Sequence, residues 1–102
     1  MNAQLAAVGV LLARVERLAR DLADDPDGHV WRSTTELRTT FDARGPVEPA
    51  VARVLDSVVM LRRGQRNGAR REFQRRAHGI DRLEQVLEGE LLPTLRVLGF
   101  LV

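Results

Sequence analysis

Residues 5–22 read LAAVGVLLARVERLARDL. Apolar side chains recur in this stretch every three or four residues, at Leu5, Val8, Leu12, Val15, Ala19 and Leu22. This spacing places them on one side of an amphipathic α-helix, and it is the a/d pattern through which helices pack against one another. We therefore predict a long helix here. It should end near Asp24 or Asp25, because Pro26 disfavours helical geometry at the residue before it.

The segment after this turn fits two kinds of secondary structure. Ser33 and Glu36 have the spacing of a helix capping box, which predicts a loop up to about Arg32 and a short helix over residues 34–43. Four threonines, and the set of every second residue at Trp31, Ser33, Thr35, Leu37, Thr39 and Phe41, would also suit a strand. A single strand would have nothing to pair with, so a helix with Ser33 as its N-cap is the first interpretation.

Two further apolar segments predict long helices. Valines and leucines between residues 47 and 61 follow Pro46 and Pro49, which suit a helix start. Many of these residues are β-branched, so the burial of a broad apolar face must hold this helix. Gly64, Asn67 and Gly68 mark the next turn, with a kinked continuous helix as the alternative. Residues 69–91 again repeat apolar side chains at helical spacing, and Pro93 should kink or end that helix.

The whole chain is expected to form one domain. Its 102 residues have the usual size of a domain, and no apolar run reaches the roughly 18 residues that a membrane span requires. We predict an all-α fold, a small antiparallel helical bundle of three long helices and one short helix over residues 1–102, in which residues 93–102 form a docking tail. No positive segment precedes the apolar residues 6–13, which argues against a secretory signal and favours a cytoplasmic protein.

The side chains that carry chemistry are few. The chain has no cysteine, which excludes disulfides, thiolate nucleophiles and sulfur-bound zinc. Neither His29 nor His78 stands in a metal-binding motif. The acidic run at residues 24–28 lacks both obligatory carboxylates of a calcium loop. We therefore expect no enzymatic activity, no metal and no cofactor.

The apolar pattern predicts a protein that acts through partners. We expect a non-enzymatic helical interaction or scaffold module that self-associates, most simply as a homodimer, or docks to a larger protein. The apolar residues expected to contact the partner are Leu5, Val8, Leu12 and Val15 in the first helix and Leu98, Phe100 and Leu101 in the tail. The alternative for the tail is that it folds back and caps its own bundle.

The distribution of charge predicts a second function. All 16 basic residues are arginine, and residues 62–76 hold seven of them against one glutamate. Such a segment fits a small arginine-rich nucleic-acid-associated protein or regulator. The residues expected to bind an anionic partner are Arg62, Arg63, Arg66, Arg70, Arg71 and Arg75. The other interpretations are an acidic protein partner and a solvated face that pairs with the chain's own acids, Glu84 among them.

The salt dependence of binding tests the arginine segment. If it binds phosphate, changing Arg66, Arg70 and Arg71 to glutamine should flatten the slope of log affinity against log salt on duplex DNA by about 2.7, because about three charge contacts are lost. We expect instead that the wild type shows no salt-sensitive binding to duplex or single-stranded nucleic acid. Tight binding to random-sequence DNA at physiological salt, lost in the triple variant, would favour the nucleic-acid function.

Overall fold

The computed structural model describes residues 2–22, 29–65 and 70–101, and it describes the side chains of all of these except residues 2, 64, 65 and 70–76. The helical elements are α1 (Asn2–Asp21), α2 (His29–Asp42), α3 (Val47–Gln65), α4 (Arg70–Val86), the π-helical turn η1 (Leu87–Leu91) and α5 (Leu92–Val97). The described residues contain no strand. The prediction of an all-α fold is therefore confirmed.

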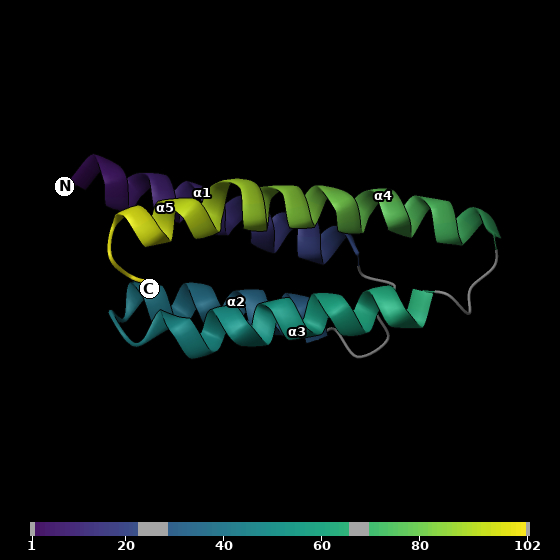
Figure 1. The fold of residues 1–102 in the computed structure, drawn as a ribbon, viewed down its shortest axis with the longest axis horizontal. Helices are drawn as coiled ribbons and strands as arrows, with labels where there is room; N and C mark the ends of the chain where they lie inside the picture. Colours follow the sequence, from purple (N-terminus) through teal and green to yellow (C-terminus); the bar gives the residue numbers. More distant parts are fainter. Residues whose placement is uncertain (1, 23–28, 66–69, 102) are drawn as a thin grey trace.

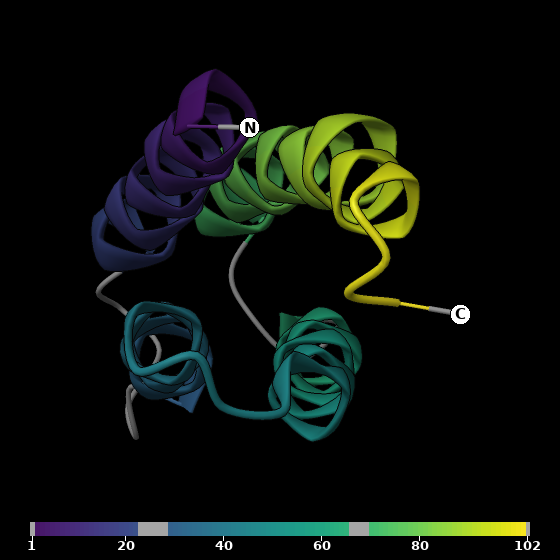
Figure 2. The ribbon, with the colours of Figure 1, turned by 90° about the vertical axis from the view of Figure 1, so that its left-hand side faces the viewer.

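The helices lie side by side in an elongated bundle of 46 × 21 × 19 Å. Successive long helices run in alternate directions, and α4, η1 and α5 together form one continuous rod (Figure 1). Seen along the bundle, α1 and α4 form one layer and α2 and α3 form the other (Figure 2). Each helix contacts the next one in the chain, and α4 also contacts α1. A four-membered ring of helices therefore encloses a single core.

The predicted stripe of α1 supplies one wall of this core. Val8, Leu12 and Val15 are almost completely buried, and Ala19 follows them on the same side. Leu5 lies at the edge, with 37% of its surface exposed. The helix that the spacing predicts is therefore present, but it ends at Asp21, before the predicted end. The predicted turn over residues 24–28 lies outside the described residues.

The second helix begins earlier than predicted, at His29. The predictions of a loop up to Arg32 and of Ser33 as an N-cap are wrong. Ser33 lies buried within the helix, and its hydroxyl donates a hydrogen bond to the Val30 carbonyl (3.0 Å). Thr34 is also buried and donates in the same way to the Trp31 carbonyl (2.8 Å). Because carbonyls of the preceding turn accept from these hydroxyls, polar side chains can face the core of a helix, and the strand alternative fails.

The buried face of α3 is narrower than the apolar pattern predicted. Val54 and Val58 are buried, as the pattern requires, but half of the surface of Val59 is exposed. Gly64 lies inside α3 rather than in a turn, since the helix continues to Gln65. The predicted turn at Asn67 and Gly68 lies outside the described residues.

The last helix changes its hydrogen-bonding pattern before Pro93. Its core leucines at positions 83, 87, 91 and 95 are all buried, although they are separated by intervals of four. On a regular helix of 3.6 residues per turn, each such step turns the side chain about 40° further round the axis, so the last leucines would leave the core. The π turn η1 absorbs this drift, and the Leu92 N–H donates to the Leu87 carbonyl, five residues back.

Pro93 does not end the rod. Proline lacks an N–H donor, but it is tolerated in the first turn of a helix, and Pro93 is the second residue of α5, directly after the π turn. The Thr94 hydroxyl also donates to the Glu90 carbonyl (2.7 Å). α5 continues to Val97, beyond the predicted end at Leu91.

The same kind of turn ends both α2 and α5. Arg44 adopts a left-handed conformation (φ 57°) after α2, and the Gly45 N–H donates to the Thr40 carbonyl (2.9 Å). Gly99 adopts it after α5 (φ 84°), and the Phe100 N–H donates to the Leu95 carbonyl (2.9 Å). Such turns satisfy the free carbonyls of a helix end and reverse the chain. The turn at Gly99 thereby directs the tail back towards the bundle (Figure 2).

Ion pairs join the helices all round the ring. In each pair an arginine on one helix meets one or two carboxylates on a neighbouring helix. The pairs are Arg38–Glu16 (α2 to α1), Arg53–Glu36 (α3 to α2), Arg62 with Asp81 and Glu84 (α3 to α4) and Arg14–Glu90 (α1 to η1). Their side chains are largely exposed, so each contributes less than about 1 kcal/mol to stability.

Gly79 of α4 lies against the side chain of Leu22, the residue that follows the end of α1. A Cβ atom added at Gly79 would lie 2.6 Å from Leu22 Cδ2, whereas one added at Gly9 would meet nothing within 4 Å. The absence of a side chain at Gly79 therefore permits the end of α1 to pack against α4.

This contact predicts different effects of the same substitution at two glycines. Gly9→Ala should raise the free energy of unfolding by about 0.5–1 kcal/mol, because alanine is the better helix former. Gly79→Ala should gain less, because Leu22 must move, and should recover the full gain in a Leu22→Ala background. Urea unfolding of the single and double variants measures this coupling. Equal gains at Gly9 and Gly79 in the wild-type background would contradict the proposed constraint.

Candidate functional site

The apolar residues of α1 that we expected to contact a partner lie in two different environments. Val8, Leu12 and Val15 face the other helices of their own chain and are buried there, and only Leu5 retains substantial exposure. In this conformation the three buried side chains cannot reach a second molecule. The stripe therefore forms the core, and a contact surface must be sought on the outward side of α1.

The outward side of α1 is also apolar in its first half. The exposed apolar side chains there, which we call the N-terminal apolar face, are those of Ala3, Leu5, Ala6, Ala7, Val10 and Ala13, with the polar Gln4 exposed beside them. Val10 has 62% of its surface exposed, and the first charged residue of the chain is Arg14. A helix that is apolar all round is normally buried on every side, but the bundle covers α1 on one side only. The sequence does indicate this face, because residues 5–13 contain no polar or charged side chain. The heptad pattern accounts only for the buried side of the helix, so the apolar character of its outward side was missed.

A groove of about 480 Å³ lies between α1 and the rod that faces it. Its lining residues are Arg14, Arg17 and Leu18 on α1 and Arg82, Gln85, Val86 and Glu90 on α4 and η1. The sequence does not predict this site, because its two walls are far apart in the chain and only the antiparallel packing of α1 and α4 brings them together (Figure 1).

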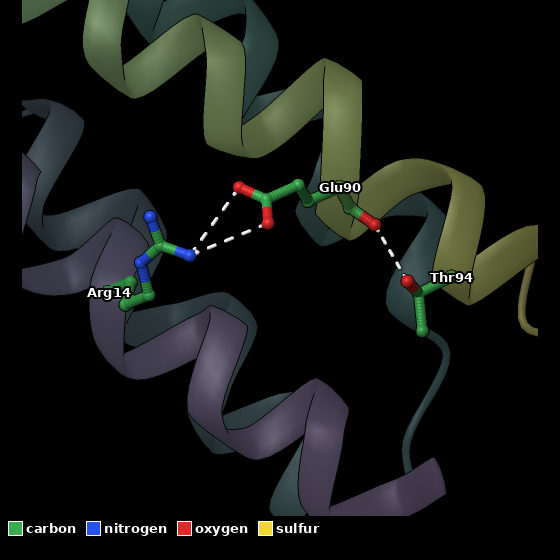
Figure 3. A network of polar contacts seen from close by, with 3 residues as sticks. All are labelled: Arg14, Glu90 and Thr94. Carbon is green, nitrogen blue, oxygen red and sulfur yellow. Dashed lines mark hydrogen bonds and ion pairs between the residues drawn. The ribbon is translucent and has the colours of Figure 1, made fainter.

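The groove is cationic and only partly neutralised. Arg14 Nη1 lies 3.5 and 3.4 Å from the two carboxylate oxygens of Glu90 (Figure 3). These distances exceed the roughly 2.7–2.9 Å of a strong charge-assisted hydrogen bond, and both side chains are about half exposed, at 52% and 50%. Within the described part of the chain, Arg17 and Arg82 have no ion-pair partner.

The tail folds back onto its own bundle. Leu98, Phe100 and Leu101 are each partly buried and pack against the core. The Phe100 ring meets the Phe41 ring of α2 edge to face, with 5.4 Å between centroids and 61° between planes. This is the alternative that the sequence analysis left open for the tail, in which it caps its own chain.

The predicted anion-binding segment is described only at its start. Arg62 donates to Asp81 Oδ1 (2.8 Å) and Glu84 Oε1 (3.0 Å), and these hydrogen bonds raise the pKa of its guanidinium above the ordinary value. Arg63 is exposed. Arg66 lies outside the described residues, as do the side chains of Arg70, Arg71 and Arg75. Of the two arginines of the segment whose side chains are described, Arg62 therefore joins α3 to α4, with Glu84 as one partner.

The described residues provide no cluster of histidine, aspartate or glutamate side chains that could hold a metal ion. His29 and His78 are both exposed and lie on different helices. Among the helices that the structure describes, none is both long and apolar enough to cross a membrane.

Comparison with models of known protein families, with curated proteins and with solved structures gave no match to this chain. The N-terminal apolar face and the groove are therefore the features of the molecule that bear on its function.

The aromatic contact of the tail predicts a loss of stability on its removal. Phe100→Ala should lower the free energy of unfolding by about 1–3 kcal/mol, through lost apolar burial and the lost contact with Phe41. Val97→Ala is the matched control, because Val97 is 81% exposed and should change stability by less than about 0.5 kcal/mol. Chemical unfolding followed by circular dichroism measures both. An unchanged stability in Phe100→Ala would show that the tail does not cap the bundle in solution.

Proposed function

We propose that this protein is a non-enzymatic helical interaction module that self-associates through the N-terminal apolar face of α1. The observation that supports the proposal is the exposure of Val10 and its alanine neighbours on a helix segment that is apolar all round. Contact with another apolar surface would remove this face from water, at about 25 cal/mol for each Å² buried.

The composition of the face favours a second copy of the chain as the partner. In a two-fold dimer the same surface meets itself, so a charge near the axis would face its own copy. The N-terminal apolar face carries no charge before Arg14. Its alanines are small, so two helices can approach closely along it. Docking to a larger protein through the same face is the other form of this function.

A nucleic-acid function receives less support. Arg62 is engaged with Asp81 and Glu84 of its own chain, which reduces the charge that the arginine segment can offer to phosphate. We therefore place the proposed interaction on α1 rather than on residues 62–76.

A charge placed in the face should break the association without unfolding the chain. Val10→Glu should weaken dimerisation at least about tenfold, because each dimer would bury two unpaired carboxylates. Met60→Glu is the matched control: Met60 is exposed to the same extent as Val10, at 62%, but lies on α3, diagonally opposite α1 in the ring. Sedimentation velocity at tens of micromolar protein measures both variants, and circular dichroism verifies their folding.

The salt dependence and the wild-type result provide the contradicting outcomes. Apolar association should persist at about 0.5 M salt, where exposed charge pairs are screened. A wild-type protein that sediments as a monomer at tens of micromolar, at low salt and at about 0.5 M salt alike, would overturn the proposal of self-association. Equal loss of association in Val10→Glu and Met60→Glu would show that the contact does not lie on α1.

A further inference from the structure

We propose that the groove between α1 and α4 binds a phosphomonoester of a small molecule. Arg17 and Arg82 would hold the phosphate, and the apolar side chains of Leu18 and Val86 would contact the body of the ligand. This site is separate from the N-terminal apolar face, and the proposal does not rest on self-association.

The size and shape of the groove fit a small ligand. Its volume of about 480 Å³ lies within the range of roughly 300–1,000 Å³ that is usual for small-molecule sites. Both walls belong to helices packed into the core, since Val15 and Leu83 lie behind them and are fully buried. The arginines therefore project from a rigid frame, and binding need not order the backbone.

The charge of the groove selects the class of ligand. Arg14, Arg17 and Arg82 face one carboxylate, that of Glu90, which leaves a net charge of +2. A phosphomonoester carries a charge of about −1.5 to −2 at neutral pH and has three acceptor oxygens, so it matches this excess, whereas a monocarboxylate neutralises only half of it. The planar guanidinium also suits phosphate, because its donors form a fork that can bind two oxygens.

The free arginines and the long ion pair show where the phosphate would sit. Arg17 and Arg82 have no ion-pair partner in the described residues, so their donors are open to a ligand. Arg14 is held by Glu90 only at 3.4 Å or more and could turn to a bound phosphate (Figure 3). Glu90 then competes with the ligand, because its carboxylate repels the phosphate and attracts the same arginine.

Titration of the full chain with phenyl phosphate at low ionic strength tests the proposal. We expect saturable binding, seen by NMR as shifts of the Gln85 side-chain amide and the arginine Nε–H groups. Inorganic phosphate should bind more weakly, since it offers no apolar body to Leu18 and Val86. Benzoate should also bind more weakly, because it carries a single charge. Binding should weaken as the pH falls below the second phosphate ionisation near pH 6.

Three variants localise the binding. Arg17→Gln combined with Arg82→Gln should weaken phenyl phosphate binding at least about tenfold, because the variant lacks charge-assisted hydrogen bonds to the phosphate. Glu90→Gln should strengthen it several-fold, by removing the competing carboxylate. Arg32→Gln combined with Arg44→Gln, both exposed on or just after α2, is the charge-matched control and should change it little. All these substitutions are at exposed positions, so circular dichroism should remain unchanged.

The opposite results would overturn the proposal. They are a titration without saturation, an equal loss of affinity in the Arg32 and Arg44 control, or weaker binding in Glu90→Gln. Binding of duplex DNA that requires Arg17 and Arg82 while phenyl phosphate does not bind would assign the groove to a macromolecule instead. Val10→Ala, which removes apolar surface from the N-terminal apolar face without adding a charge, should leave phenyl phosphate binding unchanged, so the failure of one proposal can be distinguished from the failure of the other.

Discussion

The packing of the apolar stripe of α1 against the other helices fixes the rest of the molecule. Full burial of each valine or leucine in such a stripe contributes about 1.5–3 kcal/mol, more than any exposed ion pair in the ring. Once Val8, Leu12 and Val15 point inwards, the rotation of α1 about its axis is set. Val10 must then face outwards, and Arg14 and Leu18 must lie on the side of α1 next to α4. Both surfaces that we associate with function are thus consequences of the core.

The arginines have a structural use that composition alone does not show. Four of them reach across corners of the ring to carboxylates on a neighbouring helix. Such pairs add little stability, but a wrong arrangement of helices would leave their charges without partners. Arginine has a second use in the groove: Arg17 and Arg82 have no such partner among the described residues, and we propose that they bind a ligand. Charge and apolar pattern together therefore specify how these helices are arranged.

Helices with a periodic apolar pattern could be predicted from the sequence. Features that depend on which of two possible hydrogen-bond partners a side chain takes could not. The spacing of Leu12 and Val15 is typical of a buried helix face, and that prediction held. Ser33 could donate to a carbonyl within a helix or accept from an N–H at its start, and its position in the sequence does not distinguish the two. The groove could not be predicted, because the level at which Arg17 and Arg82 meet depends on how far α1 and α4 slide along one another. The prediction that the stripe of α1 meets a partner remains untested; in this structure the stripe is used within the chain.

The π turn has a consequence for changes in chain length. It holds one residue more than a regular turn would, so deleting one residue between Leu87 and Leu91 would restore ordinary α-helical hydrogen bonds. Because the five residues of the π turn cover nearly the same rotation and rise as four residues of an α-helix, that deletion would leave the rest of the rod nearly in place. Leu95 would stay in the core, and Phe100 would still reach Phe41. A deletion within the regular turns of α4 has no such reserve: it would rotate everything after it by about 100° and release the tail without altering any of its side chains.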